Sequence, residues 1–303
     1  MLKWFSNLVR RQAIVQSGRP LFQERENAIY GLLPHLPAGL FLDVGAAAGR
    51  FGRLMLEQSP ESEVIGFEPF PGNHPYWEQQ LGGDSRARLI KAAVADTRTS
   101  ARFYVSSTVS GSETSWETMV DYSSLGKIVA DDWTAESGKI LNVDTVAIDD
   151  VIDDRHVRLI KIDVQGGEFG VLKSAVRAID AGRVDLLVIE FAGEVDVIDF
   201  LARRGYRFFD GEYLLIARPD ANLEGWDIMR GGTLSTGRPY LYAWPVAEIP
   251  QDMIKYCGIF KKWRKAVGGV WTDLVCVRPG FLNTFMVAAK RARDANRRLA
   301  LPV

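Results

Sequence analysis

The chain has 303 residues, 47% of them hydrophobic, and a formal net charge of −1, a composition typical of an ordinary globular protein. A core of this size needs no disulfide staples, and the two cysteines have no neighbouring Cys or His that would complete a zinc site. The balanced charge and the lack of an apolar run of about 18 residues argue against a polyanion-binding protein and against a spanning helix.

The first segment, residues 1–38, begins with an amphipathic stretch in which Trp4, Phe5, Leu8 and Val9 share one helical face. Basic residues interrupt this stretch and no small-residue cleavage site follows, so a secretory signal is not expected. We predict an N-terminal helical extension that packs on the rest of the chain or on a second copy in a homodimer. With no disulfide framework, a cytoplasmic location is expected.

From residue 39 to residue 217, short aliphatic runs alternate with helical patterns, which is typical of a parallel sheet with crossover helices. The runs are almost continuously apolar, as strands covered on both faces are. We therefore predict an α/β, Rossmann-like core over these residues. The expected strands are Gly39–Val44, Glu63–Glu68, Arg88–Val94, Leu159–Val164, Val184–Phe191 and a turn-linked pair near Tyr206–Ala217.

Two long segments do not follow this alternation. Residues 106–153 are too long for one crossover, so an extra strand and an active-site loop are expected there. In that loop Ser112, Thr114 and Trp116 are candidates for contacts with a sugar-like molecule, although an ordinary exposed loop has the same composition. Residues 218–303 are expected to complete the same domain with an insertion or cap, a last strand in VWTDLVCVRP and a basic C-terminal tail.

The first expected strand leads directly into a loop of small residues and then a helix. Glycines there let a ligand approach the backbone, and the N–H groups that begin the helix favour an anionic group. The spacing D-x-G-x-x-x-G lacks the middle glycine of the dinucleotide motif, and a carboxylate beside the loop would repel a pyrophosphate. The ammonium and sulfonium of S-adenosylmethionine fit better. Candidate cofactor residues are Asp43, Gly45, Ala46 and Gly49.

Acidic residues also stand at the ends of the next two strands. Glu68, followed by Pro69, ends the second strand, where a carboxylate can accept hydrogen bonds from both ribose hydroxyls. Asp96 follows the third strand and is a candidate acceptor for an adenine amino group. Three such features in order at successive strand ends predict a nucleoside-containing cofactor.

Several segments resemble the FkbM-type methyltransferase family over roughly Phe41 to Ala217. They are FLDVGAAAGRFG, VIGFEPFPGN, KAAVAD, LIKIDVQGGEFGVLKSA and VDLLVIEF. The resemblance implies a class I methyltransferase fold, with a mostly parallel seven-stranded sheet and helices on both faces. It also implies S-adenosylmethionine-dependent O-methylation of a sugar, a glycan or a small natural product. The fourth-strand block carries the most specific match, except that Gln165 stands where the family usually has Glu.

Ligands of parallel sheets bind outside the carboxyl ends of the strands, where Asp163 ends the fourth strand and Glu190 the fifth. These carboxylates are candidates for the base that deprotonates a hydroxyl acceptor, or for magnesium ligands. A buried ion pair of Asp163 with Lys161 is the structural alternative. Glu168 is a third catalytic candidate, with compensation of a helix start as its alternative. We expect catalysis without a metal ion.

The three histidines are weaker candidates for this base. His35 and His156 precede strands, at the wrong edge of the sheet. His74 follows the second strand on the ligand-facing edge, but an ordinary loop imidazole explains it as well.

Three rival functions remain open. One is a nicotinamide-dependent oxidoreductase, against which the missing glycine and Asp43 argue. Another is a catalytically silent, methyltransferase-like subunit that binds a partner through the basic C-terminal region. The third is nucleic-acid methylation, which the acidic remainder of the chain opposes. The expected partner is a small-molecule or glycan acceptor and no nucleic acid.

Overall fold

The computed structural model describes nine stretches of the chain. They are residues 32–96, 99–105, 127–129, 139–191, 194–210, 214–216, 227–233, 239–244 and 272–300. The chain separates into two compact units, one of Pro37–Glu190 and one of Met1–Leu36 with Phe191–Val303. The expected N-terminal helix and the loop with Ser112, Thr114 and Trp116 lie outside the described residues.

A seven-stranded sheet has the order β10-β14-β9-β8-β1-β2-β3. Five of its strands run parallel to their neighbours, as the alternation of strands and helices predicted. Every residue of β1 is buried, which explains its uniformly apolar sequence apart from Asp43. The five strands are β1 (Leu40–Val44), β2 (Glu63–Phe67), β3 (Ala87–Ile90), β8 (Val157–Ile162) and β9 (Val184–Phe191).

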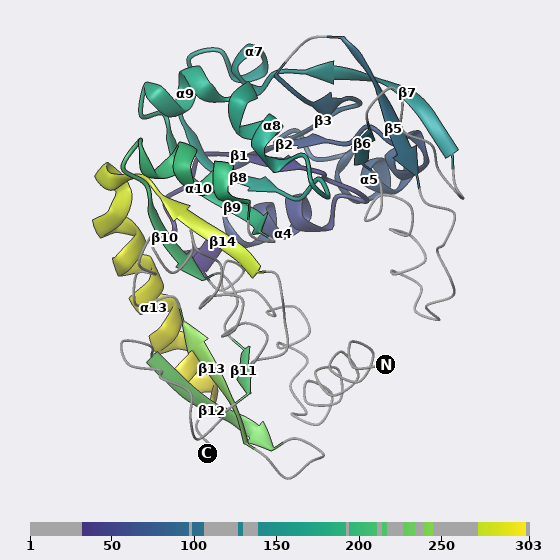
Figure 1. Cartoon of the computed structure of the whole chain (residues 1–303). Coiled ribbons are helices and arrows are strands. Elements are labelled where there is room, and N and C mark those ends of the chain that lie inside the picture. The colour runs from purple at the N-terminus through teal and green to yellow at the C-terminus, as the bar shows by residue number, and fades with distance from the viewer. Residues whose placement is uncertain are drawn as a thin grey trace, which may run out of the picture. The chain divides into compact units, whose positions relative to one another are not determined.

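Helices cover both faces of this sheet in the unit of residues 37–190. Figure 1 shows α4 (Arg50–Gln58) on one face, with α8 (Glu168–Ser174) and α9 (Val176–Asp180) on the other. Helix α5 (His74–Leu81) packs against α4 and β3. The apolar stripe of α4, which includes Phe51 and Met55, is buried. This order and layering confirm the class I methyltransferase type of fold.

A second, four-stranded sheet in the same unit has the order β4-β7-β5-β6. Its core contains Ala93, Phe103 and Val143. The extra strand expected in residues 106–153 is present as β6 and β7. The expected strand Arg88–Val94 is wrong as one element, because the chain leaves β2 after Ile90 and then pairs with β7. The elements are β4 (Ala93–Val94), β5 (Ser100–Val105), β6 (Lys127–Val129), β7 (Lys139–Val146) and, after them, α7 (Ile148–Ile152).

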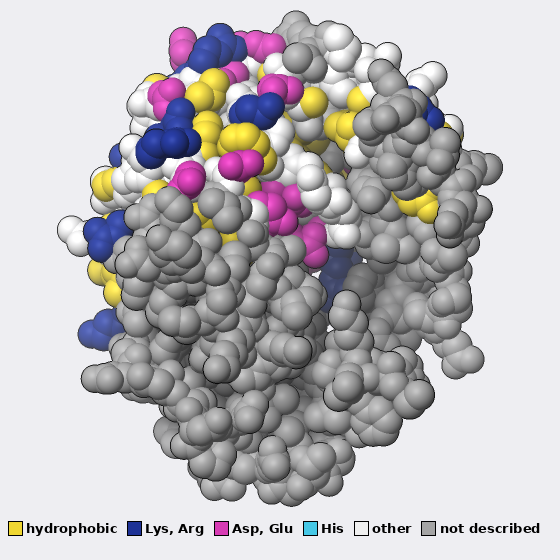
Figure 2. Space-filling model, viewed as in Figure 1, with side chains coloured by type: hydrophobic (Ala, Val, Ile, Leu, Met, Phe, Trp, Pro, Cys, Tyr) yellow, Lys and Arg dark blue, Asp and Glu magenta, His cyan; other side chains and the backbone are white. Residues whose placement is uncertain are grey.

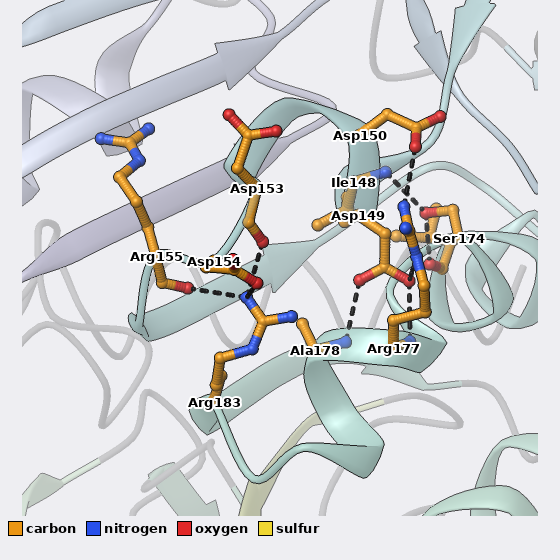
Figure 3. Close-up of polar contacts among 11 residues, drawn as sticks. Ile148, Asp149, Asp150, Asp153, Asp154, Arg155, Ser174, Arg177, Ala178 and Arg183 are labelled. Carbon is orange, nitrogen blue, oxygen red and sulfur yellow. Dashed lines mark hydrogen bonds and ion pairs between the residues drawn. The ribbon is translucent and has the colours of Figure 1, made fainter.

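Polar contacts fix α7 to the helices after β8, as Figure 3 shows. The carboxylate of Asp149 accepts the backbone N–H groups of Arg177, at 2.7 Å, and Ala178, at 2.9 Å, which caps the start of α9. Arg177 also donates to Asp150, and the hydroxyl of Ser174 accepts the N–H of Ile148. Since α7 leads into β8 and α8 follows it, these contacts stabilise the position of β8, which directly precedes Asp163.

In the other unit, β10 (Arg207–Asp210) and β14 (Thr272–Val277) pair antiparallel, so the last strand predicted in VWTDLVCVRP is confirmed. The expected pairing within Tyr206–Ala217 is wrong, because β10 pairs with β14 while β11 pairs with β13. The remaining elements are η1 (Leu33–His35), α10 (Val195–Ala202), β11 (Leu214–Ile216), β12 (Asp227–Thr233), β13 (Pro239–Trp244), η4 (Pro279–Phe281) and α13 (Leu282–Ala300). No helix among the described residues has the length and apolarity to cross a membrane.

Candidate functional site

The loop after β1 lies against the ends of its two neighbouring strands. The N–H groups of Gly45 and Ala46 both donate to the carbonyl oxygen of Phe67 at the end of β2, at 3.1 and 3.0 Å. Gly45 has φ +80, and a Cβ there would collide with the carbonyl oxygen of Asp163 just after β8. Gly45 is therefore required by the packing of the chain on itself, whether or not a ligand also approaches it.

The second glycine of the loop is explained by the helix that follows. Gly49 has φ +82, immediately precedes α4, and a Cβ there would lie 2.7 Å from Cδ1 of Trp77 in α5. Between the two glycines, Ala47 also has a positive φ, of 49°. Its N–H points to β2 and donates to Oε2 of Glu68 at 2.8 Å.

Glu68 joins the loops that follow β1 and β2. Its side chain is buried, and while Oε2 accepts the N–H of Ala47, Oε1 accepts the N–H of Phe70 at 2.8 Å. Burial raises the pKa of Glu68 to about 7, although the two N–H groups oppose the shift. Each oxygen retains a lone pair for a further donor. Pro69 lies in the turn between Glu68 and Phe70 and is partly exposed.

Asn73 adds a hydrogen-bond donor beside this carboxylate. It ends the turn Pro71–Asn73 after β2, is 2% exposed, and lowers the pKa of Glu68 through its side chain. Its Nδ2 nevertheless completes no hydrogen bond within the described part of the chain. A buried acceptor pair next to a buried unsatisfied donor suits vicinal hydroxyls, since each hydroxyl both donates and accepts.

Asp43 lies beneath the loop rather than on its open side. Its side chain is fully buried, and Oδ2 accepts the N–H of Gly52 in α4 at 3.2 Å. Burial raises the pKa of Asp43 to about 6, although the positive charge of Lys161 opposes the shift. Asp43 thus binds the start of α4, and it could influence a ligand only through the electrostatic field of its charge. Its role as a cofactor residue stays a prediction.

Lys161 connects the carboxylates of β1 and β8. It stands beside Asp43 in the register of the two strands, and its Nζ lies 3.8 Å from Oδ1 of Asp43. The same Nζ lies 3.2 Å from Oδ2 of Asp163 and over the ring of Phe51. Asp163 therefore forms the ion pair with Lys161 that is the structural alternative to a role as base or magnesium ligand.

Asp163 and Glu190 meet at the ends of β8 and β9, where they hydrogen-bond to each other and to one amide. Nε2 of Gln165 donates to Oδ1 of Asp163 at 3.0 Å and to Oε2 of Glu190 at 2.7 Å. Burial alone would raise the pKa of Asp163, but Lys161 and hydrogen bonds from Glu190 and Gln165 outweigh it and hold that pKa below its usual value. The Asp163 side chain is 37% exposed. A partly exposed, ionised carboxylate therefore stands at the ligand-facing edge of the sheet.

Glu168 holds the turn from which Gln165 projects. Its Oε1 accepts the N–H groups of Gly166, at 3.0 Å, and Val164, at 3.3 Å, and its side chain is buried at the start of α8. Glu168 therefore stabilises the turn before α8 and does not cap the helix, although its charge does stand in the first turn, as the dipole alternative expected. A direct catalytic part for Glu168 remains a prediction without support from these contacts.

The carboxylate of Asp96 forms an ion pair with Lys173 of α8 at 2.6 Å, and this hydrogen bond lowers the pKa of Asp96. Both side chains are more than 40% exposed, so an adenine amino group would have to share the carboxylate with Lys173. Nε2 of His74 lies 2.9 Å from the carbonyl oxygen of Glu68, beside the turn that follows β2. His156 pairs with Asp185 at the start of β8, at the opposite edge.

Acidic side chains reach the surface in this part of the molecule. Figure 2 shows acidic side chains gathered on the face where Figure 1 shows the ends of β8 and β9. Among the described residues, no group of three or more His, Cys, Asp or Glu side chains is arranged to hold a metal ion.

The site residues at all four strand ends lie within one family match. The family model of the methyltransferase FkbM domain matches residues 43–208, more than half of the chain, and includes Asp43, Glu68, Asp163 and Glu190. The chain belongs to the FkbM methyltransferase family. The family implies S-adenosylmethionine as the cofactor and methyl transfer as the reaction. A comparison with curated proteins finds no match.

Solved structures similar to this FkbM methyltransferase include a precorrin-6y C5,15-methyltransferase from Geobacter metallireducens GS-15. It has 12% identity and a TM-score of 0.35, covering 72% of this chain and 86% of that chain. An rRNA methylase from Streptococcus thermophilus has 11% identity and a TM-score of 0.31, covering 74% and 95%. StiE O-MT has 11% identity and a TM-score of 0.36, covering 85% and 74%. We base the function on the family match and on the site residues.

The FkbM methyltransferase site contains two residues to which the sequence assigned no role in the site. Asn73 was hidden in an ordinary Pro-Gly-Asn turn, and only its burial next to Glu68 draws attention to it. Gln165 was noted for its departure from the family pattern, but its bridge between two carboxylates depends on its positive φ. The one available signal for this conformation was that Gln165 directly precedes a glycine in an expected turn.

Proposed function

We propose that the chain is an S-adenosylmethionine-dependent O-methyltransferase whose acceptor is a hydroxyl group of a sugar, a glycan or a small natural product. The observation that carries the proposal is the partly exposed Asp163 carboxylate, kept ionised by Lys161 and Gln165 at the end of β8. Ligands of such sheets bind at this edge, and a hydroxyl acceptor needs a group that takes its proton.

The residues after β1 and β2 fit the cofactor. Glu68 and Asn73 offer acceptors and a donor for the two ribose hydroxyls, and they lie directly beside the Gly45–Gly49 loop. Bound there, S-adenosylmethionine would supply a methyl group that its positive sulfur makes electrophilic.

Asp163 would orient the acceptor hydroxyl and receive its proton. As the acceptor oxygen bonds to the methyl carbon, the electrons of the old bond leave with sulfur and the hydroxyl proton passes to Asp163, so atoms and charge balance. A hydroxyl becomes far more acidic while its oxygen forms the new bond. A carboxylate with a lowered pKa therefore serves as the proton acceptor late in this step.

The bond formed in the product tests the proposal. Cell extract or a panel of sugars and phenolic or polyketide alcohols is incubated with the protein and cofactor labelled in its methyl group. The expected product is an ether whose label survives alkali. Label that alkali releases as methanol would indicate a carboxylate acceptor, and label only on nitrogen would indicate an amine; either result would overturn the O-methyl assignment. Cofactor binding without transfer to any acceptor would favour the silent subunit.

A further inference from the structure

One amide nitrogen stands between two carboxylates at the ends of β8 and β9. Nε2 of Gln165 lies 3.0 Å from Oδ1 of Asp163 and 2.7 Å from Oε2 of Glu190. An amide nitrogen carries two hydrogens, so each carboxylate receives one of them. The opposite amide orientation would place an oxygen against two carboxylate oxygens, so the chemistry of the contacts assigns the nitrogen to this place.

The backbone of Gln165 is held in an unusual conformation to make this bridge. Its φ is +59, a conformation that residues other than glycine rarely adopt unless their surroundings impose it. Here Oε1 of Glu168 accepts the N–H groups of Val164 and Gly166, which flank Gln165 on both sides. Glu168 therefore holds the turn around Gln165, and this turn directs the Gln165 side chain toward Asp163 and Glu190.

Two carboxylate oxygens that converge on one point are an arrangement that proteins use for divalent cations. In this chain the point is filled by the partly positive N–H groups of Gln165. Nζ of Lys161, 3.2 Å from Oδ2 of Asp163, adds a full positive charge on the other side of that carboxylate. The chain's own groups thus supply the positive charge that a cation would bring.

We propose that Gln165 is a positioning residue whose amide takes the place of a divalent cation between Asp163 and Glu190. The inference rests on the proposed function, because it makes methyl transfer at this site independent of a metal ion. It also predicts that replacing the amide by a carboxylate converts the same place into a cation site, with oxygen ligands from three acidic side chains.

The test measures Mn²⁺ binding by electron paramagnetic resonance, with neither cofactor nor acceptor present. We expect Gln165→Glu to bind Mn²⁺ at least about tenfold more tightly than the unaltered chain, and the added binding to disappear when Asp163→Asn is combined with it. Binding to the unaltered chain as tight as to Gln165→Glu would overturn the proposal, as would no binding to a folded Gln165→Glu variant.

A second variant keeps the test decisive if Gln165→Glu does not fold, as judged by circular dichroism. Gln165→Ala removes the amide that bridges the two carboxylates, so Mn²⁺ should bind to it more tightly than to the unaltered chain; equal binding would overturn the proposal. Once an acceptor is known, EDTA should inhibit Gln165→Glu and leave the unaltered enzyme active. Since Mn²⁺ binding needs no methyl transfer, failure here and failure of the proposed function are distinguishable.

Discussion

The N–H of Ala47 donates to Oε2 of Glu68 at 2.8 Å, so the loop after β1 and the loop after β2 are joined by a single buried carboxylate. This contact places the acidic end of β2 directly beside the glycine loop. The two features that the sequence predicted for different parts of the cofactor are therefore in direct contact.

Replacing Glu68 should weaken cofactor binding. Glu68→Ala removes an ionisable acceptor for the ribose hydroxyls, so affinity for S-adenosylmethionine should fall by about 1.5–3 kcal/mol, the range for hydrogen bonds to charged groups. Calorimetry measures the change, and Glu57→Ala, at an exposed position of α4, is the matched control that should bind normally. Unchanged affinity in a folded Glu68→Ala variant would remove Glu68 from the cofactor site.

Cofactor affinity should also depend on pH. Burial raises the pKa of Glu68 to about 7, so the free protein is protonated there below that pH, while ribose hydroxyls donate best to the ionised form. Between about pH 6 and pH 8 the affinity should rise by about tenfold, since one pKa unit corresponds to a factor of ten. Titrations at both values check this, and Glu68→Gln should abolish the dependence. A flat profile in the unaltered chain would show that ionisation of Glu68 is not coupled to binding.

The same pKa fixes the direction of a stability effect in the free protein. A carboxyl whose folded pKa lies above its unfolded value contributes stability at low pH and loses it as pH rises through the folded pKa. Glu68 should therefore make the free protein less stable as pH increases from about 4.5 to about 7. Denaturant unfolding across this range should show a smaller pH dependence in Glu68→Gln. An identical dependence in both proteins would contradict the shift.

Replacing Gly45 should lower the stability of the fold, whether or not it also affects cofactor binding. A Cβ at Gly45 would collide with the carbonyl oxygen of Asp163, and φ +80 disfavours any side chain. Gly166→Ala is the matched control, because Gly166 also has a positive φ but nothing lies within 4 Å of its ideal Cβ. We expect Gly45→Ala to lower the calorimetric melting temperature well below that of Gly166→Ala. Equal melting temperatures would mean that the close approach to β8 carries no energy.

The sequence predicted those elements whose residue types alone indicate their structure. The uniformly apolar strands and the small-residue loop placed Asp43, Glu68, Asp163 and Glu190 at one edge of a parallel sheet, because the carboxyl ends of such strands must meet there. Pairing partners were harder to predict. The local sequence does not indicate that β10 pairs with β14 rather than with β11, since β11 and β14 are both short and apolar.

The contacts that individual side chains make within the site could not be predicted from the sequence, for a physical reason. Burial places Asp43 under the loop, and a turn held by Glu168 directs Gln165 between two carboxylates. Both facts depend on tertiary packing and on one positive φ, which residue types alone do not determine.

Single-turnover methyl transfer by Asp163→Asn, measured once an acceptor is known, tests whether this carboxylate takes the proton of the acceptor hydroxyl. We expect a folded variant with nearly normal affinity for S-adenosylmethionine and a transfer rate lower by at least about 10²-fold, the usual scale for losing a positioned base. Asp150→Asn, which alters a contact with Arg177 in the α7–α9 junction (Figure 3), should transfer at the normal rate. A near-normal rate in Asp163→Asn would contradict the account of this site.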